Sequence, residues 1–419
     1  MEDRALLTRM FEAAVAAADP AHALPEHLPA RPSGRIVVIG AGKGAAQMAA
    51  ALEAAWDGPL EGVIVTRYGH AVPCRSIRVM EAAHPVPDEA GLEASEALLD
   101  AVSGLDREDL VLALICGGGS SLLPAPPEAL TLEDEQELNR ALLASGAPIS
   151  VMNAIRKQAS RIKGGRLAAA AAPAKVVSLV VSDVPGDDPA QVASGPTVPD
   201  PIGPAEALAM IEARAIAVPE RVLRHIRSDA GAPPMPDDPV FADHEVRVIA
   251  SARLSLEAAA RVAEEAGTQV FILSDAIEGE ARDVGLVHAA IAREIVSRDR
   301  PFSRPCVLLS GGETTVTLAG EEGRGGRNTE FLLSFALAVE GLDGIVALAA
   351  DTDGIDGSED NAGAFADGSS AARMREAGVD PAAALGRNDA WGAFEASGDL
   401  FVPGPTGTNV NDFRAILIR

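Results

Sequence analysis

Short apolar runs alternate with longer amphipathic segments along this chain. Runs with almost no polar positions are typical of strands that are buried on both faces of a parallel sheet. In the first half of the chain such runs are Arg35–Ile39, Gly62–Thr66, Asp109–Cys116 and Val176–Val181, and the more polar Ile77–Glu81 is a further candidate strand. A second set of α/β elements contains the strands Glu245–Ala250, Gln269–Leu273, Cys306–Ser310 and Gly344–Ala350, followed by an apolar C-terminal strand. The pattern therefore predicts an α/β protein with a doubly wound parallel sheet.

Helical segments fill the stretches between these runs. The predicted helices span residues 1–18, 45–56, 88–102, 131–143, 150–167, 205–228, 253–266, 279–298 and 329–339. Segment 229–240 is rich in Pro, Asp and Gly and predicts a linker. We therefore expect an N-terminal domain of residues 1–235 and a smaller α/β domain of residues 240–419. This expectation leaves open that the final strand returns to the N-terminal domain.

The charge balance excludes several classes of partner. The chain has 35 basic and 61 acidic residues, and a surface with a net charge of −26 repels nucleic acid and anionic lipid. No apolar run approaches the length of a membrane span, and the acidic N-terminal segment does not resemble a signal peptide. Cys74, Cys116 and Cys306 are scattered and predict neither a disulfide nor a zinc site. Together these features predict a cytoplasmic protein.

One lysine lies in a glycine loop between a strand and a helix. Only four of the 35 basic residues are lysines, and Lys43 belongs to the loop Gly40-Ala41-Gly42-Lys43-Gly44-Ala45. The loop fits the dinucleotide pattern G-x-G-x-x-A but not a Walker A motif, and bare N–H groups at a helix N-terminus attract anions. The next strand ends in Val65-Thr66-Arg67 without a ribose-binding acid, which disfavours NAD and leaves NADP open. A tight turn that binds nothing is the alternative.

A second glycine loop, Gly117-Gly118-Gly119-Ser120-Ser121, also follows an apolar run. Three glycines and two hydroxyls suit a nest for a phosphate or a carboxylate. A nucleophilic serine is the rival interpretation, although the motif G-x-S-x-G is absent. The third interpretation is a turn with a purely structural role.

The predicted helix 150–167 carries a polar stripe. Asn153, Arg156, Ser160 and Lys163 share one helical face, and Lys157 flanks them. In so acidic a protein, this stripe suits an anionic substrate. A solvated helix face is the alternative.

Acidic clusters and an arginine follow the later apolar runs. They are Asp183, Asp187 and Asp188; Glu313 with Arg327 and Asn328; and Asp351, Asp353 and Asp356. Carboxylates in such positions can hold Mg²⁺ or act as a base, and an arginine can reach a transferring phosphoryl group. Ordinary turns are the alternative for each acidic cluster. Combined with two glycine loops, these residues are the parts needed for phosphoryl transfer.

Nine ordered motifs give the chain a family resemblance. They are GAGKGA, HPVPDEAG, LICGGGSSLLPAP, NAIRKQASRIKGGRL, SDVPGDDPAQVASGPTVPDP, LLSGGETTVTL, GRGGRNTEF, AADTDGIDG and PTGTNVND. With these motifs the chain resembles the class II glycerate kinase family, whose C-terminal portion is called the MOFRL domain. The resemblance implies a Rossmann-like N-terminal domain, a MOFRL-type C-terminal domain and a site in the cleft between them. It also implies ATP- and Mg²⁺-dependent phosphorylation of D-glycerate at O2.

The lysine and arginine singled out in that family match Lys43 and Arg327, which we expect to neutralise the transferred phosphoryl group. By residue chemistry, Asp183 or Asp188 orients the substrate hydroxyl. Asp351 and Asp353 are the predicted magnesium ligands. The predicted binding residues for substrate and nucleotide are Gly40, Gly42, Gly117, Gly118, Gly119, Ser120, Ser121, Asn153, Arg156, Lys157, Glu313 and Asn328.

Two other functions fit the same residues. An NAD(P)H-dependent hydroxypyruvate reductase would use the first glycine loop for its cofactor, and a non-catalytic sensor would bind a nucleotide or a sugar acid without turnover. The expected partners are D-glycerate and ATP, with neither nucleic acid nor membrane, and a homodimer is allowed.

Overall fold

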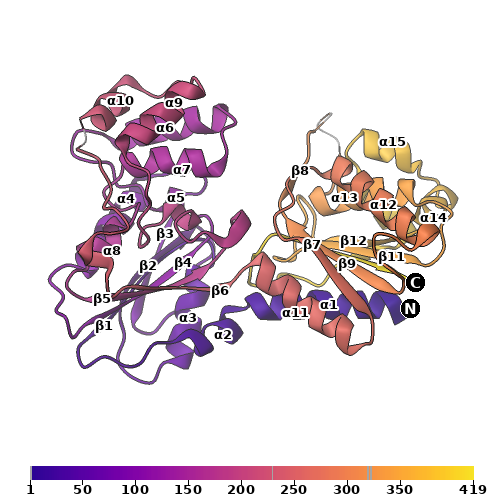
Figure 1. Cartoon of the computed structure of the whole chain (residues 1–419), viewed down its shortest axis with the longest axis horizontal. Coiled ribbons are helices and arrows are strands. Elements are labelled where there is room, and N and C mark those ends of the chain that lie inside the picture. Colours follow the sequence, from indigo (N-terminus) through magenta and orange to yellow (C-terminus); the bar gives the residue numbers. More distant parts are fainter. Residues whose placement is uncertain (1, 229, 319, 321–322) are drawn as a thin grey trace. The chain divides into compact units, whose positions relative to one another are not determined.

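The computed structural model describes residues 2–228, 230–318, 320 and 323–419, so residue 229 of the predicted linker lies outside the described residues. The chain forms two compact units (Figure 1). Pro20–Ile249 make up the parallel-sheet unit, and Met1–Asp19 with Ala250–Arg419 make up the mixed-sheet unit. Among the described residues, no helix combines the length and apolarity that a bilayer crossing requires.

The parallel-sheet unit is built on six strands. They are β1 (Ile36–Ala41), β2 (Glu61–Arg67), β3 (Ile77–Ala82), β4 (Leu110–Cys116), β5 (Lys175–Val181) and β6 (Glu245–Ala250), in the order β3-β2-β1-β4-β5-β6. Strand β1 pairs in parallel with both β2 and β4, so the strand order reverses at this point. This is the Rossmann order, in which ligands bind beside the carboxyl ends of the strands at the reversal. The loops after β1 and β4 therefore occupy the expected binding position.

Helices cover both faces of this sheet. The helices of this unit are α2 (Pro20–Ala23), α3 (Ala45–Ala55), α4 (Glu89–Ala101), α5 (Gly119–Leu122), α6 (Leu132–Ala144), α7 (Ile149–Gln158), α8 (Arg166–Ala170), α9 (Pro204–Ala213) and α10 (Glu220–Arg227), with short 3₁₀ turns at Pro25–His27, Pro185–Asp187, Val192–Ser194 and Pro239–Phe241. Helices α4 and α8 bury Leu98 and Leu167 against one face, and α3 packs against the other (Figure 1). Helices α6, α7, α9 and α10 bury a separate small core against one another.

The mixed-sheet unit has a different strand pattern. Its main strands are β7 (Gln269–Ser274), β9 (Cys306–Gly312), β11 (Ile345–Asp351), β12 (Gly363–Asp367), β13 (Leu400–Phe401) and β14 (Asp412–Ile418), and β8 (Gly279–Glu280) pairs separately with β10 (Thr314–Thr315). The order is β13-β12-β11-β14-β9-β7. Strand β14 is antiparallel to β9 and β11, whereas β7 is parallel to β9.

Helices also sandwich the mixed sheet. They are α1 (Glu2–Ala18), α11 (Ala252–Glu265), α12 (Ala281–Arg298), α13 (Arg327–Ala338), α14 (Ser370–Glu376), α15 (Pro381–Gly386) and α16 (Ala390–Ser397). Because successive strand residues face opposite sides, Leu308 and Ile416 pack against α12 and α13, while Leu309 and Leu417 pack against α1 and α11 (Figure 1).

The α/β class and the Rossmann-like N-terminal sheet are confirmed, but the compact units differ from the predicted domains. Strand β6 joins the parallel sheet, so segment 229–240 lies inside that unit rather than between the units. Helix α1 belongs to the mixed-sheet unit, where Leu7 and Phe11 pack on the sheet. The final strand, β14, pairs with β9 and β11 and does not return to the N-terminal sheet. Periodicity identifies a strand or helix, but it does not identify the sheet on which that element packs.

Two predicted helices are interrupted. The helix expected over 150–167 ends at Gln158 and resumes at Arg166, because Gly164 and Gly165 have φ of +64° and +80°, outside the helical region. The helix expected over 205–228 is likewise divided into α9 and α10. The stripe from Asn153 to Lys163 therefore does not lie on one helical face.

Candidate functional site

The loops after β1 and β4 lie directly against each other. The N–H of Lys43 donates to the carbonyl oxygen of Gly117 at 2.8 Å, and the N–H of Gly44 donates to Cys116 Sγ at 3.2 Å. Gly42 has φ of +135°, and a Cβ at this position would overlap Cys116. Glycine is therefore needed for the two loops to approach this closely.

Lys43 differs from the other lysines of the chain. The others pair with carboxylates: Lys157 with Asp200, Lys163 with Glu135, and Lys175 with Glu245. In the part of the chain that the structure describes, Lys43 has no such ion pair. The loop thus presents an ammonium group that no carboxylate of the described residues neutralises.

The ends of β2 and β3 contribute to the same edge of the sheet. At the end of β2, Thr66 Oγ1 donates to the carbonyl oxygen of Lys43 at 3.1 Å. Beyond β3, His84 Nε2 lies 3.2 Å from the position that a Cβ on Gly118 would take, and Lys43 Cε lies 3.1 Å from it. Burial, followed by the charges of Lys43 and Arg67, lowers the pKa of His84 to about 4. His84 was not predicted; its only signal in the sequence was its place in the motif HPVPDEAG.

The two candidate carboxylates after β5 have different surroundings. Asp183 lies against Gly117, where an added Cβ would overlap its carboxylate. Asp188 stabilises its own turn, because it accepts hydrogen bonds from the N–H of Ala190 at 3.0 Å and from Gln191 Nε2 at 3.2 Å. Only Asp183 of this pair is placed next to the second glycine loop.

A chain of hydrogen bonds connects the second loop to α7. Ser120 and Ser194 hydroxyls are 2.8 Å apart, and Ser194 Oγ donates to Asn153 Oδ1 at 3.0 Å. Arg156 Nη1 donates to the same Asn153 oxygen at 3.0 Å, and Ser121 donates to the carbonyl oxygen of Gly118 at 3.3 Å. Ser194 has φ of +60°, a strained conformation for a residue with a side chain that is often found at functional sites. The predicted residues Ser120, Asn153 and Arg156 thus belong to one network, and Ser194 was missed.

Three other predicted binding residues lie in the interior. Gly40 is part of β1 and packs against β4, and Gly119 begins α5 in close contact with Ala193. Lys157 is fully buried in its ion pair with Asp200. The structure gives the ammonium of Lys157 an internal partner instead of an anionic ligand.

Arg327 is the centre of a carboxylate cluster in the mixed-sheet unit. It is the first residue of α13, and its guanidinium contacts Asp412 Oδ1 at 2.5 Å, Asp351 Oδ2 at 2.7 Å and Glu313 Oε1 at 3.2 Å. Although burial opposes it, Asp412 and then Asp351 raise the pKa of Arg327. The guanidinium is therefore a permanent cation held in a fixed orientation.

The acidic residues of this cluster come from neighbouring strands. Asp412 begins β14 and lies opposite Asp351, the last residue of β11, and opposite Gly312 at the end of β9. Burial raises the pKa of Asp412, but Arg414 and Arg327 outweigh burial and hold this pKa below its usual value. Asp412 was not predicted, because its only signal was its place in PTGTNVND.

Asn328 and the α13 N-terminus bind internal partners. Asn328 Nδ2 donates to Asp412 Oδ1 at 2.9 Å. The N–H groups of Asn328 and Thr329 donate to the buried carboxylate of Asp356 at 2.9 and 2.8 Å. The carboxylate of Asp356 therefore satisfies two N–H groups at the start of this helix that have no partner within the helix.

The predicted magnesium ligands do not fit a magnesium site as they lie. Asp351 is paired with Arg327, and burial raises the pKa of Asp351 well above its usual value. Asp353 accepts a hydrogen bond from the N–H of Ile355 at 2.8 Å. Within the described ranges, no three His, Cys, Asp or Glu side chains are grouped so that they could share a metal ion.

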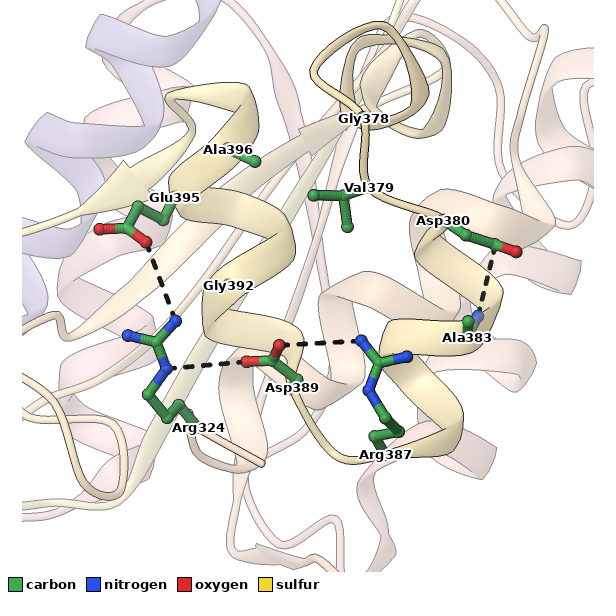
Figure 2. A pocket seen from close by; sticks show the side chains of 10 residues that line it. All are labelled: Arg324, Gly378, Val379, Asp380, Ala383, Arg387, Asp389, Gly392, Glu395 and Ala396. Carbon is green, nitrogen blue, oxygen red and sulfur yellow. Dashed lines mark hydrogen bonds and ion pairs between the residues drawn. The ribbon is translucent and has the colours of Figure 1, made fainter. Parts of the chain in front are cut away.

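The mixed-sheet unit also has an open pocket of about 530 Å³, which is lined by α15, α16 and the segment that precedes α15 (Figure 2). Its charged side chains face one another: Arg324 approaches Glu395 and Asp389 at 3.9 Å each, and Arg387 approaches Asp389 at 4.0 Å. None of the predicted site residues lines this pocket.

A Rossmann-ordered sheet with two glycine loops at its strand reversal defines the parallel-sheet unit as a nucleotide-binding type of fold. Two families match the sequence: a domain of unknown function (DUF4147) over residues 6–227 and the MOFRL family over residues 306–412. The chain belongs to the glycerate kinase family.

Similar proteins support this assignment along the whole chain. A D-glycerate 2-kinase of Thermotoga maritima is 40% identical over 409 residues, which cover 97% of this chain and 96% of that protein. A crystal structure of a glycerate kinase from Thermotoga maritima superimposes with a TM-score of 0.90 at 38% identity and covers 100% of both chains. A protein of Agrobacterium vitis that carries the provisional name hydroxypyruvate reductase is 55% identical over 417 residues. The aligned residues cover 99% of this chain and 94% of that protein.

Proposed function

We propose that this protein is a glycerate 2-kinase, which transfers the γ-phosphoryl group of ATP to O2 of D-glycerate. The observation that carries the proposal is the placement of Lys43. Among the described residues it is the lysine without a carboxylate partner, and it lies between two glycine loops at the strand reversal of a Rossmann-ordered sheet. The similarity to a D-glycerate 2-kinase over nearly the full length supports the same reaction.

In this proposal, the protein contributes charge and orientation. The ammonium of Lys43 and the N–H groups of the two loops stabilise negative charge on the phosphates, as preorganised donors do. Asp183, next to Gly117, orients the substrate hydroxyl. The network of Ser120, Ser194 and Asn153 holds the second loop in place.

On the mixed-sheet unit, we assign Arg327 as the cation that binds phosphate oxygens. Its guanidinium is fixed by Asp412 and Asp351, and fork-shaped donors suit phosphate oxygens. Magnesium is assigned to no residue of the chain, and we treat it as part of the Mg–ATP substrate.

Hydroxypyruvate reductase is the second candidate, because the provisional name of the Agrobacterium vitis protein and the pattern G-x-G-x-x-A both favour it. The end of β2 argues against NAD, since Thr66 is bound to the backbone of Lys43 and the next residue is Arg67 rather than an acid. Arg67 remains compatible with NADP.

One experiment separates the candidates. The purified protein is assayed with Mg–ATP and D-glycerate, with ADP release as the readout, and separately with hydroxypyruvate and NADH or NADPH, with absorbance as the readout. The proposal expects glycerate-dependent ADP release and a phosphorus NMR signal of 2-phosphoglycerate. Oxidation of the reduced cofactor without any ATP requirement would establish the reductase, and no turnover in either assay would contradict both enzymes and favour a sensor.

A further inference from the structure

The imidazole of His84 and the side chain of Lys43 meet above Gly118. His84 Nε2 and Lys43 Cε lie 3.2 and 3.1 Å from the same point, the place where a Cβ on Gly118 would be. Among the described residues, neither ring nitrogen of His84 forms a hydrogen bond with another protein group, although the residue is half-buried. The imidazole of His84 therefore lies beside the second glycine loop, and within the described residues its ring nitrogens have no hydrogen-bond partner.

Burial and the neighbouring cations keep the His84 ring neutral. Burial is the largest effect, and the cations Lys43 and Arg67 add to it, so the pKa of His84 falls to about 4. His70 lies in the field of the same two cations, and the carboxylate of Asp183 lies next to Gly117. At neutral pH, His84 thus carries a lone pair that can accept a proton.

A bound triphosphate would change this balance in a useful direction. Its negative charge at Lys43 would offset the contribution of the two cations, although not that of burial, so we expect the pKa of His84 to rise when the nucleotide binds. A base is most effective when its pKa is near the working pH. The nucleotide would then prepare the base for the reaction.

We propose that His84 is the general base of the phosphoryl transfer, an inference that rests on the proposed kinase function. As the substrate O2 forms a bond to the γ-phosphorus, the bond from that phosphorus to the bridging oxygen breaks and ADP leaves. The hydroxyl proton passes to His84 Nε2 and is later released to solvent. Asp183 orients the hydroxyl, and Lys43 neutralises the phosphate.

The test compares His84→Gln with His70→Gln. Glutamine keeps a polar group of similar reach but cannot accept the proton. We expect His84→Gln to lower kcat by about 10²-fold or more, the usual contribution of a general base, with the KM for ATP within about threefold of wild type. His70→Gln should retain wild-type kcat. Added imidazole should partly restore His84→Ala, which a purely structural role would not allow.

A second measurement does not depend on turnover. The C2 proton of His84 is titrated by NMR, and its signal is assigned as the one that His84→Gln lacks. The pKa should rise when β,γ-methylene-ATP is added to the full-length protein. An unchanged pKa, or full kcat in His84→Gln alongside loss in Asp183→Asn, would overturn the assignment of His84 while leaving the kinase intact. Absence of glycerate-dependent ADP release by the wild type would instead overturn the proposed function itself.

Discussion

The backbone N–H of Lys43 donates a 2.8 Å hydrogen bond to the carbonyl oxygen of Gly117, and this bond joins the two glycine loops of the parallel-sheet unit. The bond fixes the start of the Lys43 side chain, while the left-handed Gly118, with φ of +78°, leaves room for the rest of it. The position of the ammonium group therefore depends on the backbone of both loops.

Replacing Gly118 by alanine should displace Lys43. The new Cβ would lie 2.9 Å from Lys43 Cγ and 3.2 Å from His84 Nε2, so we expect kcat to fall by at least about tenfold. The left-handed backbone adds a stability cost of about 1–2 kcal/mol. Gly104→Ala is the matched control, because Gly104 has φ of +67° and nothing within 4 Å. Equal kcat in the two variants would show that Lys43 does not need this space.

Loss of the Arg327 guanidinium should destabilise the mixed-sheet unit. Arg327→Ala would leave the buried carboxylates of Asp412 and Asp351 without this cation, and breaking such a pair typically costs about 3–5 kcal/mol. Arg300→Ala removes an exposed pair with Glu294, for which a much smaller loss is expected because solvent screens such pairs. Urea unfolding of both variants measures the difference. If the free energy of unfolding falls no more in Arg327→Ala than in Arg300→Ala, the account of this cluster is contradicted.

Acid should weaken the fold through His288. Nδ1 of this buried residue donates to the carbonyl oxygen of Val284 at 2.8 Å, and Nε2 accepts from Ser310 Oγ at 3.0 Å. Burial, with Arg414 nearby, lowers the pKa of His288 to about 4. Between pH 6.5 and 4 the unfolded chain binds a proton that the folded chain does not, so the free energy of unfolding falls as the pH falls through this window.

The variant His288→Gln isolates this effect. The free energy of unfolding is measured by urea at pH 7.5 and pH 5 for both proteins. We expect the free energy of unfolding to drop less in the variant, by about 1–2 kcal/mol, between the two pH values. Uptake of one proton by the unfolded chain over one to two pH units contributes about this much. An identical drop in both proteins would mean that His288 is not the group responsible.

Local patterns in the sequence predicted the elements well and their assembly less well. The apolar runs around Val38, Leu112 and Val177 became the central strands, because continuous burial on both faces leaves a strong signature. The same signal could not show that β6 joins the first sheet or that α1 joins the second unit, since such partners are chosen by packing across long sequence distances.

The sequence predicts a candidate site residue where a charged side chain and glycines directly follow a strand. Lys43 and Asp183 follow that rule, whereas Arg327 follows two glycines at the start of a helix. His84, Ser194 and Asp412 were not predicted because each is a single polar residue in a loop or at a strand start, and each contacts residues that are distant in the sequence, as Ser194 contacts Ser120. Lys157 was assigned to binding because a sequence does not display a buried partner such as Asp200.

The most direct test of the central claim compares two lysine variants in the glycerate-dependent ADP release assay. Lys43→Ala removes the ammonium between the glycine loops, whereas Lys175→Ala removes one that pairs with Glu245 at the unit's surface. The account predicts that kcat falls by about 10²-fold or more in Lys43→Ala, the loss expected when one charge-stabilising donor is removed, and stays at the wild-type value in Lys175→Ala. Near-full activity in Lys43→Ala would contradict it.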